Sequence, residues 1–339
     1  MKYCINDVDY AKAEKKFEEE FNKEWEIVLS ELDCQQSQLL LGNRLRPKIV
    51  FWGFVASKTS SELNTLSFKN VARTAVSIEL FHKASLLIDD WLDNDTARHG
   101  EKTFHVELGV QYTVVFAIHI ICLAIWRIKS IFIDNLQDED LYQSCIQKIS
   151  DLVYGMSFGA LQELQLKRKE LYNIDKIKTI AHFETAEIIE KSLQIGYALG
   201  DSKSENVSAI LNIIGSQCGY LFQTLNDLEA FSNFEKNAEH KGFVNFDIDN
   251  NRKNIVVSML WELASSKDKK LIQNSSGINI CYIGRKYHLK SFVLNDMEVV
   301  YNNMINNIKS LEDYGICQKW VNAFSDFFSQ IRDIAYDRL

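Results

Sequence analysis

Apolar residues recur at helical spacing along most of this chain, and polar stretches separate the periodic segments. In the clearest segment an apolar or small residue falls on one helix face at each turn from Asn70 onward, and Gly100 is the first strong helix breaker. Alternating charged and apolar positions also predict an amphipathic first helix. The predicted helical segments are residues 9–33, the run from Asn70, two or three helices within 112–170, one begun near Ser208, and residues 260–339.

The scarcity of strong turn residues indicates the fold class. Among 339 residues there is one proline, Pro47, and there are 14 glycines. This composition favours long helices over a sheet with many turns, and 46% hydrophobic residues supply a large core. The most apolar run, Val114 to Trp126, is shorter than the ~20 residues of a membrane span and contains His119, so we expect a central core helix and no transmembrane segment.

The charge balance limits the classes of partner. The formal net charge is -8, and no basic stripe compensates it, which argues against nucleic-acid binding. An anionic ligand would need a local basic pocket. The seven cysteines are widely spaced and form no C-x-x-C pair, and the first residues lack the apolar segment of a signal peptide. We therefore expect reduced thiols and a cytoplasmic protein.

Candidate chemistry is concentrated where the helix from Asn70 ends. Asp89 and Asp93 are four residues apart and so share a helix face, with Asp90 beside them. Carboxylates at a helix C-terminus repel one another and oppose the helix dipole, which favours a bound cation. Mg²⁺ prefers oxygen ligands and is usually held by one or two carboxylates together with substrate phosphates. The pattern predicts a magnesium-dependent site for a phosphorylated ligand.

Basic residues follow the acidic cluster closely. Arg98, His99 and Lys102 lie within about three helical turns of it in sequence and could contact the same phosphates. A solvated acidic helix end with a nearby ion pair is the alternative interpretation of this stretch taken alone.

The stretch resembles the first aspartate-rich motif of the trans-isoprenyl diphosphate synthase (polyprenyl synthetase) family, H-x-x-S-L-x-x-D-D-x-x-D followed by R-R-G, a histidine and a glycine. His99 stands where that motif has its second arginine. The matching residues are His82, Ser85, Leu86, Asp89, Asp90, Asp93, Arg98, Gly100, His105 and Gly109.

The resemblance extends upstream to a segment that reads G-K-x-x-R-P in the family, where its lysine and arginine hold isopentenyl diphosphate. Gly42, Arg46 and Pro47 match, but Asn43 replaces the lysine. A neutral amide cannot supply the lysine's charge. Together with His99, this change predicts a weakened acceptor site, which Arg44, Arg46 and His82 would help to form.

The second aspartate motif of the family, F-Q-x-x-D-D-x-x-D, is matched in part. Phe222, Gln223 and Asp227 agree, whereas Asn226 and Ala230 replace the first and last aspartates. Asn226 keeps an oxygen ligand but loses a charge. The resemblance therefore implies metal ligation by Asp89, Asp93, Asn226 and Asp227, with weaker binding at the second motif.

Three further family features have counterparts here. A central helix carries Gln162 and Glu163 as weak candidates. The lysine-threonine pair that holds the allylic diphosphate aligns with Glu184-Thr185 by counting, although Lys178-Thr179 fits the letters and Lys191-Ser192 is nearby, so its position stays open. A later lysine that closes over that diphosphate corresponds to Lys253, with Arg252 beside it.

Residues before the first aspartate line the hydrocarbon cavity in the family. At ~100° per residue, Ser85 and Phe81 point toward the side of Asp89, whereas Ala84 points largely away. Phe81 could form a floor that limits the product to a medium length. Plain core packing is an equally good explanation of these positions.

The resemblance implies an all-α isoprenoid-synthase bundle, a single domain over residues 1–339 with its motifs in about 40–260, and a homodimer. It also implies a Mg²⁺-dependent prenyltransferase in which Asp89, Asp90, Asp93, Arg98, Asp227 and Lys253 are catalytic and Gln223 contacts substrate. The expected reaction condenses an allylic isoprenyl diphosphate with isopentenyl diphosphate to give a longer trans-prenyl diphosphate. Two alternatives remain: a terpene synthase or prenyltransferase with a different acceptor, and a non-catalytic partner subunit of a prenyl synthase.

Overall fold

The computed structural model describes residues 7–32, 44–58, 68–133, 139–200, 204–232, 252–316 and 318–338. Within these ranges the chain is almost entirely helical, which confirms the all-α prediction. Asn43 and Gly42 lie outside the described residues, as does most of the polar stretch before Arg252. The long helices are α1 (Asp7–Leu32), α5 (Lys69–Leu92), α7 (Val110–Ile133), α8 (Glu139–Leu164), α11 (Glu205–Ser232), α16 (Leu289–Ser310) and α17 (Gln318–Arg338).

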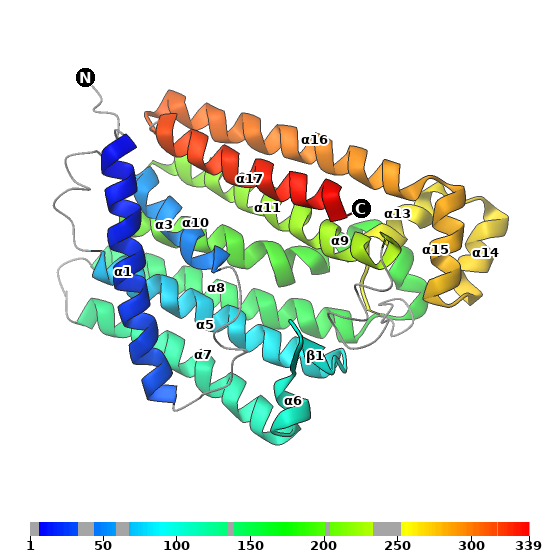
Figure 1. Ribbon diagram of the computed structural model, residues 1–339, viewed down its shortest axis with the longest axis horizontal. Helices are drawn as coiled ribbons and strands as arrows, with labels where there is room; N and C mark the ends of the chain where they lie inside the picture. Colours follow the sequence, from blue (N-terminus) through cyan, green and yellow to red (C-terminus); the bar gives the residue numbers. More distant parts are fainter. Residues whose placement is uncertain are drawn as a thin grey trace.

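Most of the long helices run along one direction, while α1 crosses α5 and α7 near the opposite end from the short helices that follow α11 (Figure 1). The buried apolar residues from Tyr10 to Phe328 form one cluster between these helices. The carboxyl end of α5 and the start of α13 therefore lie toward the same end of the bundle. The shorter elements are α3 (Leu45–Ala56), α6 (Phe104–Glu107), η1 (Arg168–Tyr172), α9 (Ile174–Ala181), η2 (His182–Ala186), α10 (Glu187–Leu199), α13 (Ile255–Leu263), α14 (Ser266–Asn274), α15 (Gly277–Lys286) and η4 (Leu311–Tyr314).

A close helix pair fixes α3 in the centre of the bundle. A Cβ atom added to Gly53 of α3 would collide with the backbone of Leu193, and one added to Gly196 of α10 would collide with the backbone of Val50. Only glycine lets the two backbones approach this closely. The contact fixes the position of α3, whose first turn carries Arg46 close to Glu79 and Lys83 of α5.

The helix α5 ends in a two-stranded hairpin. Strands β1 (Ala97–Arg98) and β2 (Glu101–Lys102) are antiparallel, and the two residues between them, His99 and Gly100, have φ of 52° and 83°. Positive φ at both central positions is typical of the tight turns that join such strands. His99 is exposed on this turn, and the hairpin directs Arg98 back toward α5.

The helix that contains the most apolar run extends beyond that run at both ends. The helix α7 has 24 residues, and Val110–Ile131 is long and apolar enough to cross a membrane by length and composition, which is weak evidence on its own. One face packs into the core through residues such as Ile120 and Ile128, as predicted. The other face is apolar and exposed, with Val115 and Trp126 at its centre.

Candidate active site

The three aspartates at the end of α5 have different environments. Asp90 is 2% exposed and accepts hydrogen bonds from Arg98, with Nε 2.6 Å and NH2 2.5 Å from Oδ1. Burial raises the pKa of Asp90, and the Arg98 hydrogen bonds lower it in part. The side chain of Asp89 is half exposed, whereas that of Asp93 is mostly covered. Asp90 therefore fixes Arg98, and Asp89 and Asp93 are the carboxylates left to face a ligand.

A guanidinium from a distant part of the sequence lies between those two carboxylates. Arg252, just before α13, places Nε 2.7 Å from Oδ1 of Asp93 and NH2 3.7 Å from Oδ1 of Asp89. The same NH2 is 3.0 Å from Oε2 of Glu163 on α8. The Asp89 and Asp93 pair thus accepts a cation, and Arg252 joins the ends of α5 and α8.

The next residue, Lys253, contacts Glu163 as well and also a further buried acid, Glu184. Its backbone N–H donates to Oε1 of Glu163 at 2.8 Å, and its ammonium forms an ion pair with Glu184 on η2. Burial raises the pKa of Glu184 to about 7, against the lowering effect of Lys253. The pKa of Lys253 is raised, because Glu184 and Glu163 outweigh the effect of its own burial. Two consecutive cations therefore meet four carboxylates from three elements.

The structure places Asp227 in a supporting position. It is 3% exposed, and its two oxygens accept hydrogen bonds from Gln223 Nε2 at 2.7 Å and from the Ile255 N–H at 2.6 Å. A carboxylate at a helix N-terminus satisfies donors that have no partner in the helix. Asp227 thereby fixes the start of α13 and the two cations before it, whereas its neighbour Asn226 is exposed.

Two of the three candidate positions for the lysine-threonine pair, which the sequence left open, differ clearly in their contacts. The Thr185 hydroxyl donates to Oε1 of Gln223 at 2.6 Å, and Glu184 contacts Lys253. In contrast, the Lys178 ammonium lies over the Tyr220 ring, 4.9 Å from its centroid. Glu184-Thr185 therefore belongs to the charged cluster. It lies in a π-helical turn, a feature often found at functional sites.

The other predicted substrate residues divide into two groups. Arg46, His82 and Arg98 are close enough to interact electrostatically, and burial lowers the pKa of His82 well below its usual value, with Arg46 the next cause. Arg44 instead donates to Oδ1 of Asn22 on α1 at 2.7 Å. Phe81 is buried in the core, and the Ser85 hydroxyl donates to the His82 carbonyl within α5.

The donor set fits a magnesium ion best when substrate phosphates complete its ligands. Among the residues that the structure describes, no three His, Cys, Asp or Glu side chains form a group that could hold a metal. Two carboxylates on one helix face, already attracting a guanidinium, match the way in which Mg²⁺ uses one or two carboxylates and substrate phosphates. Asp89 and Asp93 would hold the ion.

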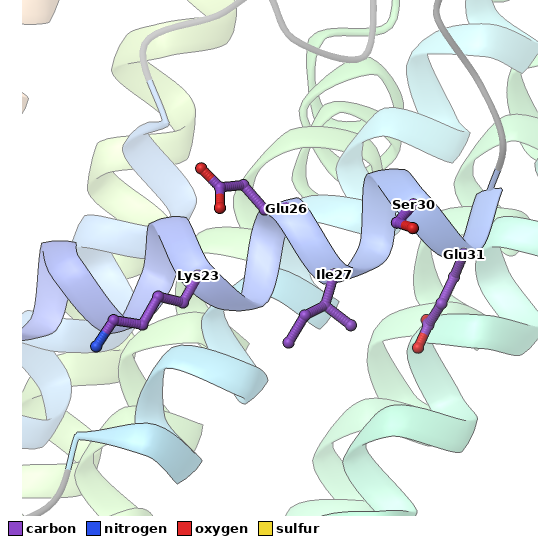
Figure 2. A pocket seen from close by; sticks show the side chains of 5 residues that line it. All are labelled: Lys23, Glu26, Ile27, Ser30 and Glu31. Atoms are coloured by element: carbon purple, nitrogen blue, oxygen red, sulfur yellow. The ribbon is translucent and has the colours of Figure 1, made fainter.

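A separate surface depression takes no part in this cluster. Lys23, Glu26, Ile27, Ser30 and Glu31 line it, and all five belong to α1 (Figure 2). One helix face with side chains that spread apart encloses no ligand, and none of these residues contributes to the charged cluster.

Sequence reasoning named Arg252, Glu163 and Glu184 individually but missed how they pair. Arg252, rather than Lys253, reaches Asp89 and Asp93, and Glu163 and Glu184 receive the two cations. The spacing of acids and cations along the chain gave no signal for these pairs, since their partners lie about 70 to 160 residues away in sequence.

Known proteins resemble the chain in sequence and in structure. A model of the polyprenyl synthetase family matches residues 33–280. The farnesyl diphosphate synthase of Buchnera aphidicola subsp. Acyrthosiphon pisum (strain APS) is 21% identical over 246 residues, which are 68% of this chain and 83% of that protein. The geranylgeranyl diphosphate synthase of Sulfolobus acidocaldarius is 25% identical over 285 residues, or 80% of this chain and 81% of that one.

The fold has the same relatives. A T. brucei farnesyl diphosphate synthase complexed with a bisphosphonate superposes with a TM-score of 0.75 at 15% identity, over 96% of this chain and 99% of that chain. A geranylgeranyl pyrophosphate synthase from Corynebacterium glutamicum, complexed with isoprenyl diphosphate and magnesium, gives a TM-score of 0.71 at 15% identity over 98% of both chains. With both aspartate motifs inside the matched stretch, the chain belongs to the polyprenyl synthetase family of prenyltransferases and has its all-α isoprenoid synthase fold.

Proposed function

We propose that this enzyme ionises an allylic isoprenyl diphosphate and joins it to isopentenyl diphosphate, which yields a longer trans-prenyl diphosphate. The family membership and relatives named farnesyl and geranylgeranyl diphosphate synthase support chain elongation. The single observation that carries the proposal is Arg252, 2.7 Å from Asp93 and beside Lys253, because it brings cations to the carboxylates that would hold a metal.

In the proposed reaction the C1–O bond of the allylic substrate breaks, and the electron pair leaves with the diphosphate. Arg252, Lys253 and Arg98 are positioned to stabilise the negative charge on that leaving group. A magnesium ion on Asp89 and Asp93 would add positive charge at the same place. The terminal carbon of the isopentenyl diphosphate double bond then bonds to C1, which leaves a cation on C3 of that substrate. The departed diphosphate takes a proton from C2, and the new double bond forms between C2 and C3.

The basic pair Arg46 and His82 would hold the acceptor diphosphate. Because burial keeps the pKa of His82 low, its imidazole is neutral near pH 7 and contributes a hydrogen bond rather than a charge. On the allylic side, Asp227 and Gln223 act indirectly, since they hold the backbone of Ile255 and the Thr185 hydroxyl.

A second function is favoured by the state of the second aspartate motif. Both Asp227 oxygens accept protein hydrogen bonds, and the exposed residue beside it, Asn226, carries no charge. A site with fewer metal-binding carboxylates is compatible with ionisation of an allylic diphosphate followed by capture on a different acceptor, or with terpene formation.

Product analysis distinguishes the two functions. The purified protein is incubated with Mg²⁺ and geranyl, farnesyl or geranylgeranyl diphosphate, each with and without isopentenyl diphosphate. We expect longer prenyl diphosphates only when isopentenyl diphosphate is present. Hydrocarbon or alcohol products in its absence would instead establish the second function.

The product length is proposed to depend on α5. Phe81 is buried two turns before Asp89 and Ser85 one turn before it, on the side of the helix that approaches the first motif. A hydrocarbon tail that passes Ser85 would meet the Phe81 ring, so we expect products of medium length.

A cytoplasmic homodimer is also proposed. The exposed apolar residues Val115, Ile118 and Trp126 on α7 and Tyr154 and Leu161 on α8 are a surface that a second copy would cover. The four described cysteines, Cys122, Cys145, Cys218 and Cys281, are in no disulfide, as is usual in reducing compartments. Sedimentation of the wild type and of Trp126→Glu tests the dimer, which the added charge should dissociate; a wild-type monomer would contradict it.

A further inference from the structure

A buried lysine lies next to the basic residues of the proposed acceptor site. Lys83 on α5 is 6% exposed, and its ammonium is 3.7 Å from Oε1 of Glu79, one turn earlier on the same helix. Arg46 on α3 is close enough to Lys83 for its charge to lower the pKa of Lys83. Burial lowers the pKa of Arg46 itself, and the charge of Glu79 opposes that effect. Lys83 and His82 therefore face the same cation of α3.

The charges that the structure describes in this group do not balance. Arg98 is paired with Asp90, and among the described residues Glu79 is the carboxylate that acts on both Arg46 and Lys83. Burial also raises the pKa of Glu79, which means that burial disfavours the negative charge of this carboxylate. A buried group with two cations and one carboxylate has an excess of positive charge, which an anionic ligand can offset.

The hydrogen bonds of the group are also incomplete. Both Nε of Arg46 and Oε2 of Glu79 are buried and have no hydrogen-bond partner among the described residues. A buried ion pair that only stabilised the fold would need good geometry and full hydrogen bonding to offset desolvation. The two unpaired atoms, on Arg46 and Glu79, fit a group that an anionic ligand and its bound water would complete.

We infer that Lys83 binds the diphosphate of the acceptor beside Arg46, and supplies the positive charge that Asn43 lacks in the segment before α3. The inference rests on the proposed function, because it identifies the ligand as isopentenyl diphosphate. The family has a lysine at the position of Asn43, and in this chain Lys83 on α5 would supply that positive charge instead. The acceptor site is then rearranged rather than weakened.

The test is direct binding of isopentenyl diphosphate and of inorganic pyrophosphate, measured by calorimetry without allylic substrate. Lys83→Gln should weaken both ligands by about 10-fold to 100-fold, the usual effect of losing one charged hydrogen bond. Lys83→Arg should stay within about threefold of the wild type, because it keeps the charge. The matched control, Lys69→Gln, changes an exposed lysine at the start of the same helix and should have no effect.

A double variant separates ligand binding from the loss of the ion pair. The variant Glu79→Gln with Lys83→Gln removes both charges of the ion pair, so no unpaired charge from that pair is buried and the fold should be retained. Binding of both ligands should remain as weak as in Lys83→Gln. If Lys83→Gln bound the two ligands with wild-type affinity, or if the double variant recovered that affinity, the inference would be overturned while the proposed elongation activity would stand. Lysine-dependent binding by a protein that forms no longer product would support the inference and overturn elongation, and a wild type that binds neither ligand would overturn both.

Discussion

The Nε atom of Arg252 lies 2.7 Å from Oδ1 of Asp93, although 159 residues separate the two in sequence. This contact joins the end of α5 to the start of α13 and occupies the helix face on which Asp89 also lies. Because a guanidinium already neutralises the carboxylates, Arg252 and a metal ion compete for them until a diphosphate arrives to attract both.

Arg252→Gln should therefore have opposite effects on metal binding and on catalysis. We expect Mg²⁺ to bind the substrate-free protein several-fold more tightly, since Asp89 and Asp93 lose a competing cation. The value of kcat should fall about 10²-fold to 10³-fold with the loss of a group that stabilises the leaving diphosphate. Calorimetric titration with Mg²⁺ measures the first effect and steady-state kinetics the second.

Lys253→Gln is the matched control for that competition. Its contacts are Glu163 and Glu184, so its removal should reduce kcat without tightening Mg²⁺ binding at the first motif. If both variants changed Mg²⁺ affinity equally, the contact of Arg252 with Asp93 would have no special part in it.

Glu184 predicts a pH dependence of allylic substrate binding. Burial raises its pKa from 4.5 to about 7, so the folded protein binds this proton more tightly than the unfolded chain does. The carboxyl is neutral below pH 7, which leaves Lys253 free to hold a diphosphate, and it becomes an anion above that pH. We expect the KM for the allylic diphosphate to rise as the pH increases through about 7.

The variant Glu184→Gln should not show this rise in KM. Because the substrate ionises in the same way in both assays, a difference between the two KM profiles comes from the protein. It also removes a pH effect on stability. Since the folded pKa is raised, the wild type should lose stability relative to the variant as the pH increases from about 4.5 to about 7. Parallel KM profiles for the two proteins would refute a role for Glu184 near the diphosphate.

Asp227 and its neighbour Asn226 should respond differently to truncation. Asp227→Ala removes acceptors for Gln223 and for the Ile255 N–H, so we expect the free energy of unfolding to fall by about 2 kcal/mol. Asn226→Ala changes an exposed side chain and should leave stability within about 0.5 kcal/mol of the wild type. Urea denaturation measures both; equal stability of the two variants would contradict the supporting position of Asp227.

Phe81→Ala should lengthen the products if the ring is the floor of the tail cavity. A control is Phe104→Ala, which removes another fully buried ring on α6. Both changes leave cavities and should cost about 3 to 5 kcal/mol, so a shift in product length confined to Phe81→Ala would not come from destabilisation. An unchanged product in both would assign Phe81 to core packing alone.

The sequence was sufficient for the fold and for one half of the site. Helical periodicity and a lone proline predict the bundle, and Asp89 and Asp93 are recognisable because four residues place them on one helix face. The facing half could not be predicted in the same way. Whether Arg252 or Lys253 reaches the first motif depends on the direction in which the chain enters α13, which is fixed by the hydrogen bond from Ile255 to Asp227.

Burial accounts for the other differences between prediction and structure. The resemblance makes Asp227 a metal ligand and Asp90 a catalytic residue, and tertiary packing buries both and pairs them with protein donors. Lys83 was not singled out in the sequence, because its burial is visible only in the folded protein. The exposed apolar face of α7 could not be predicted either, because a continuous apolar run does not show which side of the helix packs against other helices.

Release of pyrophosphate from an allylic diphosphate is the most direct test of the central claim, that the Asp89 and Asp93 pair with the cations before α13 ionises this substrate. The wild type should release pyrophosphate in the presence of Mg²⁺ and isopentenyl diphosphate, and Asp89→Ala should abolish the release while its circular dichroism and thermal unfolding stay close to those of the wild type, because Asp89 is half exposed. Undiminished release by a folded Asp89→Ala variant would contradict the account.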